Sequence, residues 1–150
     1  MSASEAFCET LIAQGVKDTF GIVGSAYMDA HDLFPAAGIR FVSVAHEQNA
    51  AHMADGYSRV TGKHGVCLAQ NGPGITNFVT GIAAAYWAHS PVVAITPEAG
   101  SMSTGLGGFQ ETEPERALNE AGKEHHHGDP CDQSGRQRFD GHHCFSTGVR

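Results

Sequence analysis

The chain has 150 residues, a length typical of a single domain, and a formal net charge of −7 at pH 7. This acidic balance argues against a nucleic-acid partner, because binding to phosphates needs basic residues in excess. No apolar run is long enough to cross a membrane, and the N-terminus lacks the basic start and apolar core of a signal peptide, so we expect a soluble, cytoplasmic protein with no membrane partner.

The first predicted helix carries its own start and stop signals. Ser2 and Glu5 form a capping-box pattern, and Gly15 suits the left-handed position that ends a helix. Apolar runs predict strands over residues 19–23, 39–45, 65–69 and 91–96. Helical spacing of apolar residues predicts further helices over residues 26–34, 47–60 and 74–88. Short connections between alternating strands and helices predict an α/β fold, with helices on both faces of a doubly wound parallel sheet.

In such a sheet, ligands bind beyond the carboxyl ends of the strands. Four segments are expected at that edge: Gly24-Ser25, His46-Glu47, Asn71-Gly72-Pro73-Gly74 and residues 97–110. These segments hold the residues with the clearest chemical potential, so we place the candidate site there.

Glu47 follows directly on an apolar strand and opens a helix. An acidic residue in a first turn interacts favourably with the helix dipole, and such residues are common without any catalytic role. The same position also leaves a semi-buried carboxylate at the edge of the sheet, where it can donate or accept a proton. Both interpretations fit the local pattern.

Gly72-Pro73-Gly74 forms a tight connection from strand to helix. Glycines let a backbone approach a planar ligand, and amides at a helix start can face an anion, although an ordinary turn has the same composition. Asn77, one helical turn further on, can hold this loop with its side-chain amide or lie in solvent. Residues 97–110 contain four glycines and end on Phe109 and Gln110, which fits a loop over a site or a long connection.

The composition changes near residue 113. Residues 111–150 contain only eight apolar residues and show little helical or strand periodicity. Such a segment cannot bury enough surface to offset the entropy lost on ordering. We therefore expect one domain over residues 1–113 and an irregular, disordered tail over residues 114–150.

Two runs in this tail contain possible metal ligands, His125-His126-His127 and His142-His143-Cys144. A metal site requires ordered ligands at fixed spacing and support from neighbouring side chains. A segment with so few apolar residues does not favour that order, so we predict no metal ligands in this chain.

Two motifs resemble signatures of the thiamine-diphosphate enzyme family: residues 45–62 (AHEQNAAHMADGYSRVTG) and residues 71–77 (NGPGITN). The resemblance covers about residues 4–113 and implies the flavodoxin-like, pyrimidine-binding N-terminal domain of such an enzyme. Members of the family are considerably longer, hold the diphosphate and Mg²⁺ in a second cofactor domain, and form the site between two subunits. We therefore expect a truncated or frameshifted chain that is inactive alone, and at least a homodimer at full length.

The resemblance also implies a role for each segment at the edge of the sheet. Glu47 is expected to hydrogen-bond ring nitrogen N1′ of the aminopyrimidine of thiamine diphosphate and to promote the imino tautomer, which removes the C2 proton of the thiazolium. The residues expected to bind the cofactor are Gly72, Pro73, Gly74 and Asn77. The residues expected to line the substrate pocket are Gly24, Ser25, Phe109 and Gln110.

Three further stretches narrow the expected reaction: residues 20–26 (FGIVGSA), 85–91 (AYWAHSP) and 105–111 (GLGGFQE). They resemble family members that convert sulfoacetaldehyde and phosphate to acetyl phosphate and sulfite. Two alternatives stay open. The first is another member of the family, of acetolactate-synthase or oxidase type, and the second is a non-catalytic truncated domain or interaction module.

Overall fold

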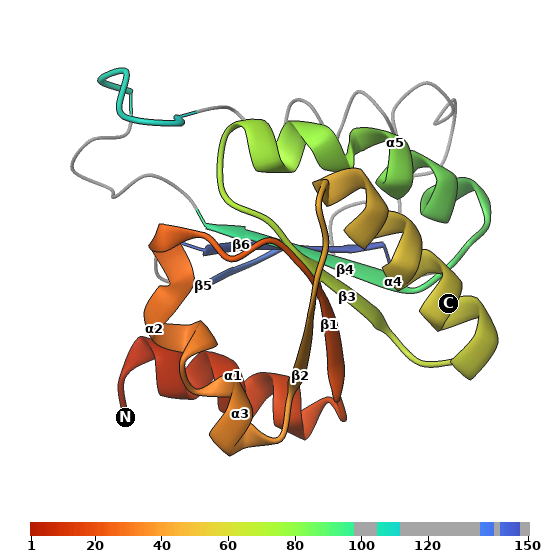
Figure 1. Ribbon diagram of the computed structural model, residues 1–150, viewed down its shortest axis with the longest axis horizontal. Coiled ribbons are helices and arrows are strands. Elements are labelled where there is room, and N and C mark those ends of the chain that lie inside the picture. The colour runs from red at the N-terminus through yellow and green to blue at the C-terminus, as the bar shows by residue number, and fades with distance from the viewer. Residues whose placement is uncertain (98–104, 112–135, 140–141, 148–150) are drawn as a thin grey trace.

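The computed structural model describes residues 1–97, 105–111, 136–139 and 142–147. A parallel sheet forms its centre, with strands β1 (Asp18–Gly21), β2 (Arg40–Ser43), β3 (Gly65–Leu68) and β4 (Val92–Pro97). These strands lie in the order β2-β1-β3-β4, so the chain leaves β1 toward one side of the sheet and leaves β3 toward the other. The predicted doubly wound α/β fold is confirmed (Figure 1).

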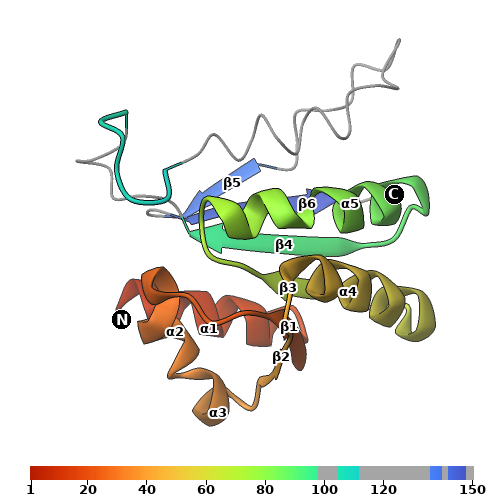
Figure 2. The same cartoon turned by 45° about the horizontal axis from the view of Figure 1, so that its top comes forward.

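Helices cover both faces of this sheet (Figures 1 and 2). One layer contains α1 (Ala3–Ala13), the 3₁₀ helix η1 (Ser25–Tyr27), α2 (Met28–His31) and α3 (Phe34–Ala37). The other layer contains α4 (Glu47–Thr61) and α5 (Pro73–Trp87). Successive residues of β3 serve the two layers in turn, since Val66 and Leu68 belong to one core cluster and Cys67 to the other.

The predicted helix signals form as expected. The backbone N–H of Glu5 donates to Ser2 Oγ at 3.2 Å, and the Ser2 N–H donates to Glu5 Oε2 at 2.6 Å, which completes the capping box of α1. Gly15 follows the end of α1 with a φ of +71°. Gly62 ends α4 in the same left-handed conformation.

The segment expected as one helix over residues 26–34 is divided in the structure into η1, α2 and, beyond a turn, α3. Pro35 lies in the first turn of α3, where its missing N–H is tolerated. A helix continued through Pro35 from α2 would lose a hydrogen bond and bring the proline ring against a carbonyl one turn earlier.

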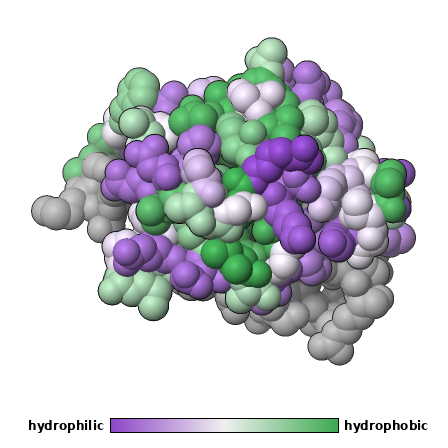
Figure 3. All heavy atoms as spheres, turned by 60° about the horizontal axis from the view of Figure 1, so that its bottom comes forward, coloured by the Kyte–Doolittle hydropathy of each residue, from purple (hydrophilic) through white to green (hydrophobic). Residues whose placement is uncertain are grey.

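The surface on the side of α1 and α3 interleaves polar and apolar side chains (Figure 3).

The structure also differs from the expected irregular tail at two short segments. Strands β5 (Arg136–Phe139) and β6 (His142–Thr147) pair antiparallel with each other, and β6 pairs antiparallel with β4. A sheet edge presents unpaired N–H and C=O groups, and an added strand satisfies them without any apolar periodicity of its own. The rest of the predicted tail, and the predicted boundary at residue 113, lie outside the described residues.

Small residues let α4 pack closely against its neighbours. A Cβ added at Gly81 of α5 would lie 2.4 Å from the Cβ of Ala51, and one added at Gly65 of β3 would lie 2.0 Å from the carbonyl oxygen of Ala54. No real side chain fits at such distances, so glycine is required for α4 to approach both α5 and β3.

We predict opposite effects for the same substitution at two helical glycines. Gly81→Ala should lower the free energy of unfolding by about 1–3 kcal/mol, because the added methyl overpacks the contact with Ala51. Gly56→Ala in α4 should raise it by about 0.5–1 kcal/mol, because nothing lies within 4 Å of the added Cβ and alanine favours the helix. Urea unfolding followed by circular dichroism measures both values, and equal effects would contradict the tight α4–α5 contact.

Candidate functional site

Glu47 and Asn77 meet between the starts of two helices. Glu47 is the first residue of α4, directly beyond β2, and Asn77 lies in the second turn of α5. Asn77 Nδ2 donates to Glu47 Oε2 at 2.9 Å, and both side chains are half-buried. The N-cap His46 accepts the backbone N–H of Gln48 through Nδ1 at 3.2 Å, which fixes the start of α4. The hydrogen bond from Asn77 means that Oε2 of the Glu47 carboxylate is held by an uncharged donor.

Gly74 borders the other oxygen of the same carboxylate. A Cβ added at this buried glycine would lie 3.2 Å from the Cβ of Ala69 and 3.5 Å from Glu47 Oε1. Gly74 therefore places only backbone beside Oε1, where a methyl group would be in van der Waals contact with that oxygen. Glu47, from the motif at residues 45–62, is thus brought together with Gly74 and Asn77, from the motif at residues 71–77. Pro73 is exposed at the first position of α5.

Gly72 has a different reason to be glycine. Its φ of +70° and ψ of −118° belong to a region that only glycine adopts readily. A Cβ at this position would also lie 2.7 Å from the carbonyl oxygen of Gln110. The segment 105–111 therefore lies directly on Gly72, and Asn71 Nδ2 donates to that same carbonyl at 3.1 Å.

The segment 105–111 is folded back on itself by Glu111. The Glu111 carboxylate accepts the backbone N–H of Gly105 and, at 2.8 Å, that of Gly108. These hydrogen bonds hold the pKa of Glu111 below its ordinary value. Phe109 extends from this loop with 86% of its surface exposed. Gln110 adopts a φ of +57°, which is uncommon for a residue with a side chain.

Gly24 and Ser25, expected on the substrate side, lie beyond the carboxyl end of β1. Gly24 is buried, and a Cβ added there would lie 1.9 Å from Oε1 of Gln70. Ser25 is exposed and starts η1. The backbone N–H of Ala26 donates to Gln70 Oε1 at 3.4 Å, so this segment is joined to the turn after β3.

Sequence reasoning did not single out Tyr27, Gln70 or the side chain of Asn71. Tyr27 is buried, and its O–H donates to the backbone carbonyl of Ile22. Burial raises the pKa of Tyr27, and the negative charge of Glu47 raises it further. Tyr27 and Gln70 lie outside the sequence motifs, and their only signal was their position near the glycines of the sheet edge. Asn71 opens the motif at residues 71–77, but the motif assigns its side chain no role.

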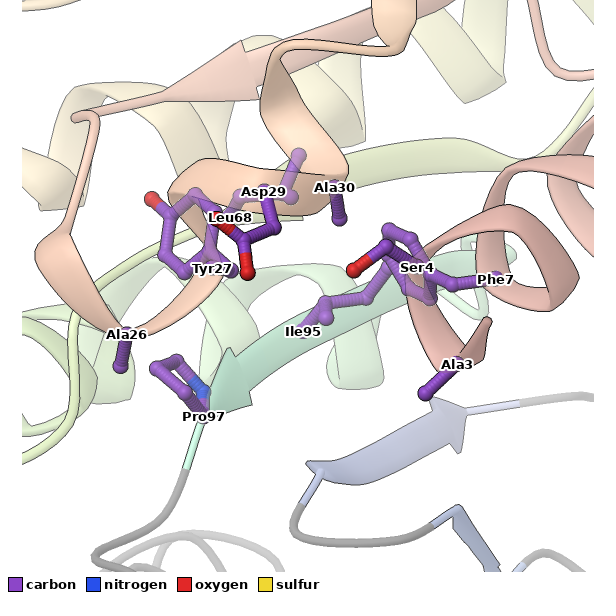
Figure 4. Close-up of a pocket in the computed structure, with 10 residues that line it drawn as sticks. All are labelled: Ala3, Ser4, Phe7, Ala26, Tyr27, Asp29, Ala30, Leu68, Ile95 and Pro97. Atoms are coloured by element: carbon purple, nitrogen blue, oxygen red, sulfur yellow. The ribbon is translucent and has the colours of Figure 1, made fainter. Parts of the chain in front are cut away.

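A cavity of about 160 Å³ lies on the face of the sheet covered by α1 and α2 (Figure 4). Its lining includes Ser4, Tyr27 and Asp29, together with Leu68 and Ile95 from the sheet. Leu68 and Ile95 belong to the core cluster beneath α1, whereas the residues beneath α4 and α5 form the other cluster. The cavity therefore lies on the α1 face of the sheet, and Ala26 and Pro97 line it at the carboxyl edge.

Over the described residues, no three His, Cys, Asp or Glu side chains are placed to hold a metal ion. His125-His126-His127 lies outside the described residues, and His142-His143-Cys144 is described only as part of the backbone of β6. No helix in the described part is long and apolar enough to cross a membrane.

Comparison with known proteins identifies the family of the chain. Residues 1–119 match the family described as thiamine pyrophosphate enzyme, N-terminal TPP binding domain. The chain belongs to this family. Thiamine pyrophosphate is the same compound as thiamine diphosphate, so the resemblance seen in the two sequence motifs is confirmed.

Several curated relatives are similar over the same region. Sulfoacetaldehyde acetyltransferase of Alcaligenes xylosoxydans xylosoxydans is 69% identical over 111 residues, covering 74% of this chain and 18% of the relative. The enzyme of that name from Castellaniella defragrans is 65% identical over 111 residues, covering 74% and 19%. Acetolactate synthase isozyme 3 large subunit of Escherichia coli K12 is 46% identical over 112 residues, covering 74% and 20%. The matched region thus spans about a fifth of the length of these relatives.

Gly72→Ala should release the loop 105–111 without unfolding the sheet. An alanine at φ +70° is strained by about 1–3 kcal/mol, and its methyl group would collide with the carbonyl of Gln110. We expect large amide shift changes at Gly105–Glu111 in NMR spectra and small ones in β1. Gly38→Ala provides the control, because its φ is also positive but nothing lies within 4 Å of the added Cβ. Equal shifts of the loop in both variants would contradict the contact.

The loop should also loosen on acidification. Because the pKa of Glu111 is lowered in the folded chain, its hydrogen bonds contribute stability above the ordinary value of 4.5, and that stability is lost as the pH falls through the lower folded pKa. The amide proton shifts of Gly105 and Gly108 should titrate with a midpoint below 4.5. Glu111→Gln should abolish this titration, whereas a midpoint at or above 4.5 would contradict the assigned hydrogen bonds.

Proposed function

We propose that Glu47, Gly74 and Asn77 hold the aminopyrimidine of thiamine diphosphate, as the N-terminal part of an enzyme that converts sulfoacetaldehyde and phosphate to acetyl phosphate and sulfite. The observation that carries the proposed site is the Glu47 carboxylate at the carboxyl edge of the sheet, held at Oε2 by Asn77 and bordered at Oε1 by Gly74, which has no side chain. The 69% identity to a sulfoacetaldehyde acetyltransferase supports the proposed reaction.

The residues fit a planar ring that carries hydrogen-bonding nitrogens. Asn77 donates to one carboxylate oxygen, so the remaining oxygen of Glu47 is available to exchange a proton with a ring nitrogen. Gly74 presents only backbone beside that oxygen, which allows a flat ligand to approach. The exposed Pro73 and the glycine-only backbone of Gly72 shape the turn before α5.

Each residue then has a distinct task. Thiamine diphosphate, when bound, supplies the carbanion chemistry that attacks a carbonyl carbon. With the pyrimidine bound, Glu47 Oε1 would exchange a proton with its ring nitrogen, and Asn77 would keep the carboxylate oriented toward that nitrogen. Gly24, Ser25, Phe109 and Gln110 face the substrate side of the pocket, where the loop 105–111 limits access of water.

The remaining parts of the cofactor site are assigned to the portion of the relatives that this chain does not span. The diphosphate and Mg²⁺ require oxygen ligands and charge, which we place in a second cofactor domain. We further propose that the complete enzyme is at least a homodimer and acts in the cytoplasm. The acidic balance of the chain supports a small-molecule role over a nucleic-acid role.

The proposed role of Glu47 is tested in a chimera in which residues 1–111 of this chain replace the matched segment of the Alcaligenes enzyme. Glu47→Gln should slow hydrogen exchange at C2 of bound thiamine diphosphate by about 10²–10⁴-fold, because the amide retains hydrogen bonding but cannot transfer the proton. NMR of the quenched cofactor measures this rate. Glu9→Gln, an exposed change on α1, should leave it unaltered, and unchanged exchange in Glu47→Gln would refute the assignment.

The proposed substrate is tested in the same chimera without substitutions. Sulfite release from sulfoacetaldehyde that depends on phosphate is the expected result, because the segment is 69% and 65% identical to two sulfoacetaldehyde acetyltransferases. Formation of acetolactate from pyruvate without sulfite release would instead favour the acetolactate-synthase alternative, which the similarity to the Escherichia coli enzyme raises.

A further inference from the structure

Two adjacent side-chain amides connect the three segments at the edge of the sheet. The Ala26 backbone N–H, beyond β1, donates to Gln70 Oε1 at 3.4 Å. Gln70 Nε2 donates to Asn71 Oδ1 at 2.7 Å, and Asn71 Nδ2 donates to the carbonyl of Gln110 at 3.1 Å. A continuous chain of hydrogen bonds therefore runs from the segment after β1, through the turn after β3, to the loop 105–111.

The direction of this chain is determined at both ends. The backbone N–H of Ala26 can only donate, and the carbonyl of Gln110 can only accept, so each amide has a single orientation that satisfies its neighbours. Asn71 is only 8% exposed. A donor or acceptor left without a partner at such a position is costly, so the hydrogen bonds of Gln70 and Asn71 depend on each other.

Two glycines make room for the two ends of this chain of hydrogen bonds. Gln70 Oε1 occupies the position beside Gly24, where an added Cβ would lie at 1.9 Å, and the Gln110 carbonyl occupies the position beside Gly72, where it would lie at 2.7 Å. A side chain at either glycine would displace one end. The two glycines and the two amides therefore form one structural unit.

The chain of hydrogen bonds ends in the loop at Gln110, whose backbone conformation is uncommon. Gln110 has a φ of +57°, and its carbonyl is the group that Asn71 binds. A non-glycine residue in this conformation persists only where its surroundings hold it. Phe109, directly before it, is 86% exposed and packs on little of the described chain, so its position depends on the backbone beside it.

We propose that Gln70 and Asn71 are positioning residues that form an amide clasp, which sets where the loop 105–111 stands relative to the Glu47 site. The clasp acts through the backbone of Gln110 and touches no substrate. Its effect on substrate use rests on the proposed function, because Phe109 and Gln110 line the substrate side only if that function holds. Its effect on the loop is independent of any activity.

The first test uses the 150-residue chain and two nearly isosteric changes. Asn71→Asp removes the donor to Gln110, and Gln70→Glu removes the donor to Asn71 while leaving the acceptor for Ala26. Backbone order parameters over residues 105–111, from ¹⁵N relaxation, should fall from near 0.85 to below about 0.6 in both variants. The effect of Gln70→Glu is decisive, because the chain of hydrogen bonds is what links Gln70 to this loop.

Matched controls separate the clasp from a general loss of stability. Asn49→Asp adds the same charge at an exposed position near the start of α4 and should leave the loop ordered. Order parameters in β1 and β3 report whether each variant remains folded. If Asn71→Asp unfolds the chain, Gln70→Glu at its half-buried position carries the test. Unchanged loop order in a folded Gln70→Glu variant would overturn the clasp.

The second test measures substrate use in the chimera with the Alcaligenes enzyme. Both substitutions should raise KM for sulfoacetaldehyde about tenfold or more and leave C2 exchange of the bound cofactor unchanged, since Glu47 and Asn77 are not part of the clasp. An unchanged KM with a loosened loop would overturn the role in substrate positioning. Failure of Glu47→Gln to slow C2 exchange would instead refute the proposed function and leave the loop result standing.

Discussion

Gly81 lets α5 approach α4 so closely that an added Cβ would lie 2.4 Å from the Cβ of Ala51. The site depends on this approach, because its two polar partners come from different helices. Glu47 opens α4 and Asn77 lies near the start of α5, so their 2.9 Å hydrogen bond forms only when the helices are packed at this distance. A core contact between small residues thus determines the geometry of a polar site at the edge of the sheet.

The glycines at this edge serve three different purposes. Gly74 leaves space beside a carboxylate oxygen, Gly72 combines an unusual backbone conformation with contact to Gln110, and Gly24 makes room for the side chain of Gln70. A glycine-rich edge is therefore not simply a surface for a ligand. Part of it accommodates the protein's own side chains, and these in turn hold the loop that borders the site.

This division bears on how the site would work in a complete enzyme. The carboxylate proposed to transfer a proton is positioned by the packing of α4 against α5, whereas the loop with Phe109 is held by a few hydrogen bonds. Changes to helix packing should therefore affect the cofactor chemistry, and changes to the amide clasp should affect the substrate side. The cofactor chemistry and the substrate side can change separately, because they depend on different interactions.

The sequence by itself determined the α/β class, the four parallel strands, the capping box of α1, the glycine that ends α4 and the family, because periodicity, caps and motifs are local properties of the chain. Glu47 and Asn77 were candidates from their motifs, but their hydrogen bond was not predictable. Only the tertiary structure decided that contact, the pairing of β6 with β4 and the amide clasp. Each of these joins residues far apart in the chain or depends on which backbone groups remain unpaired, and no local pattern records either property.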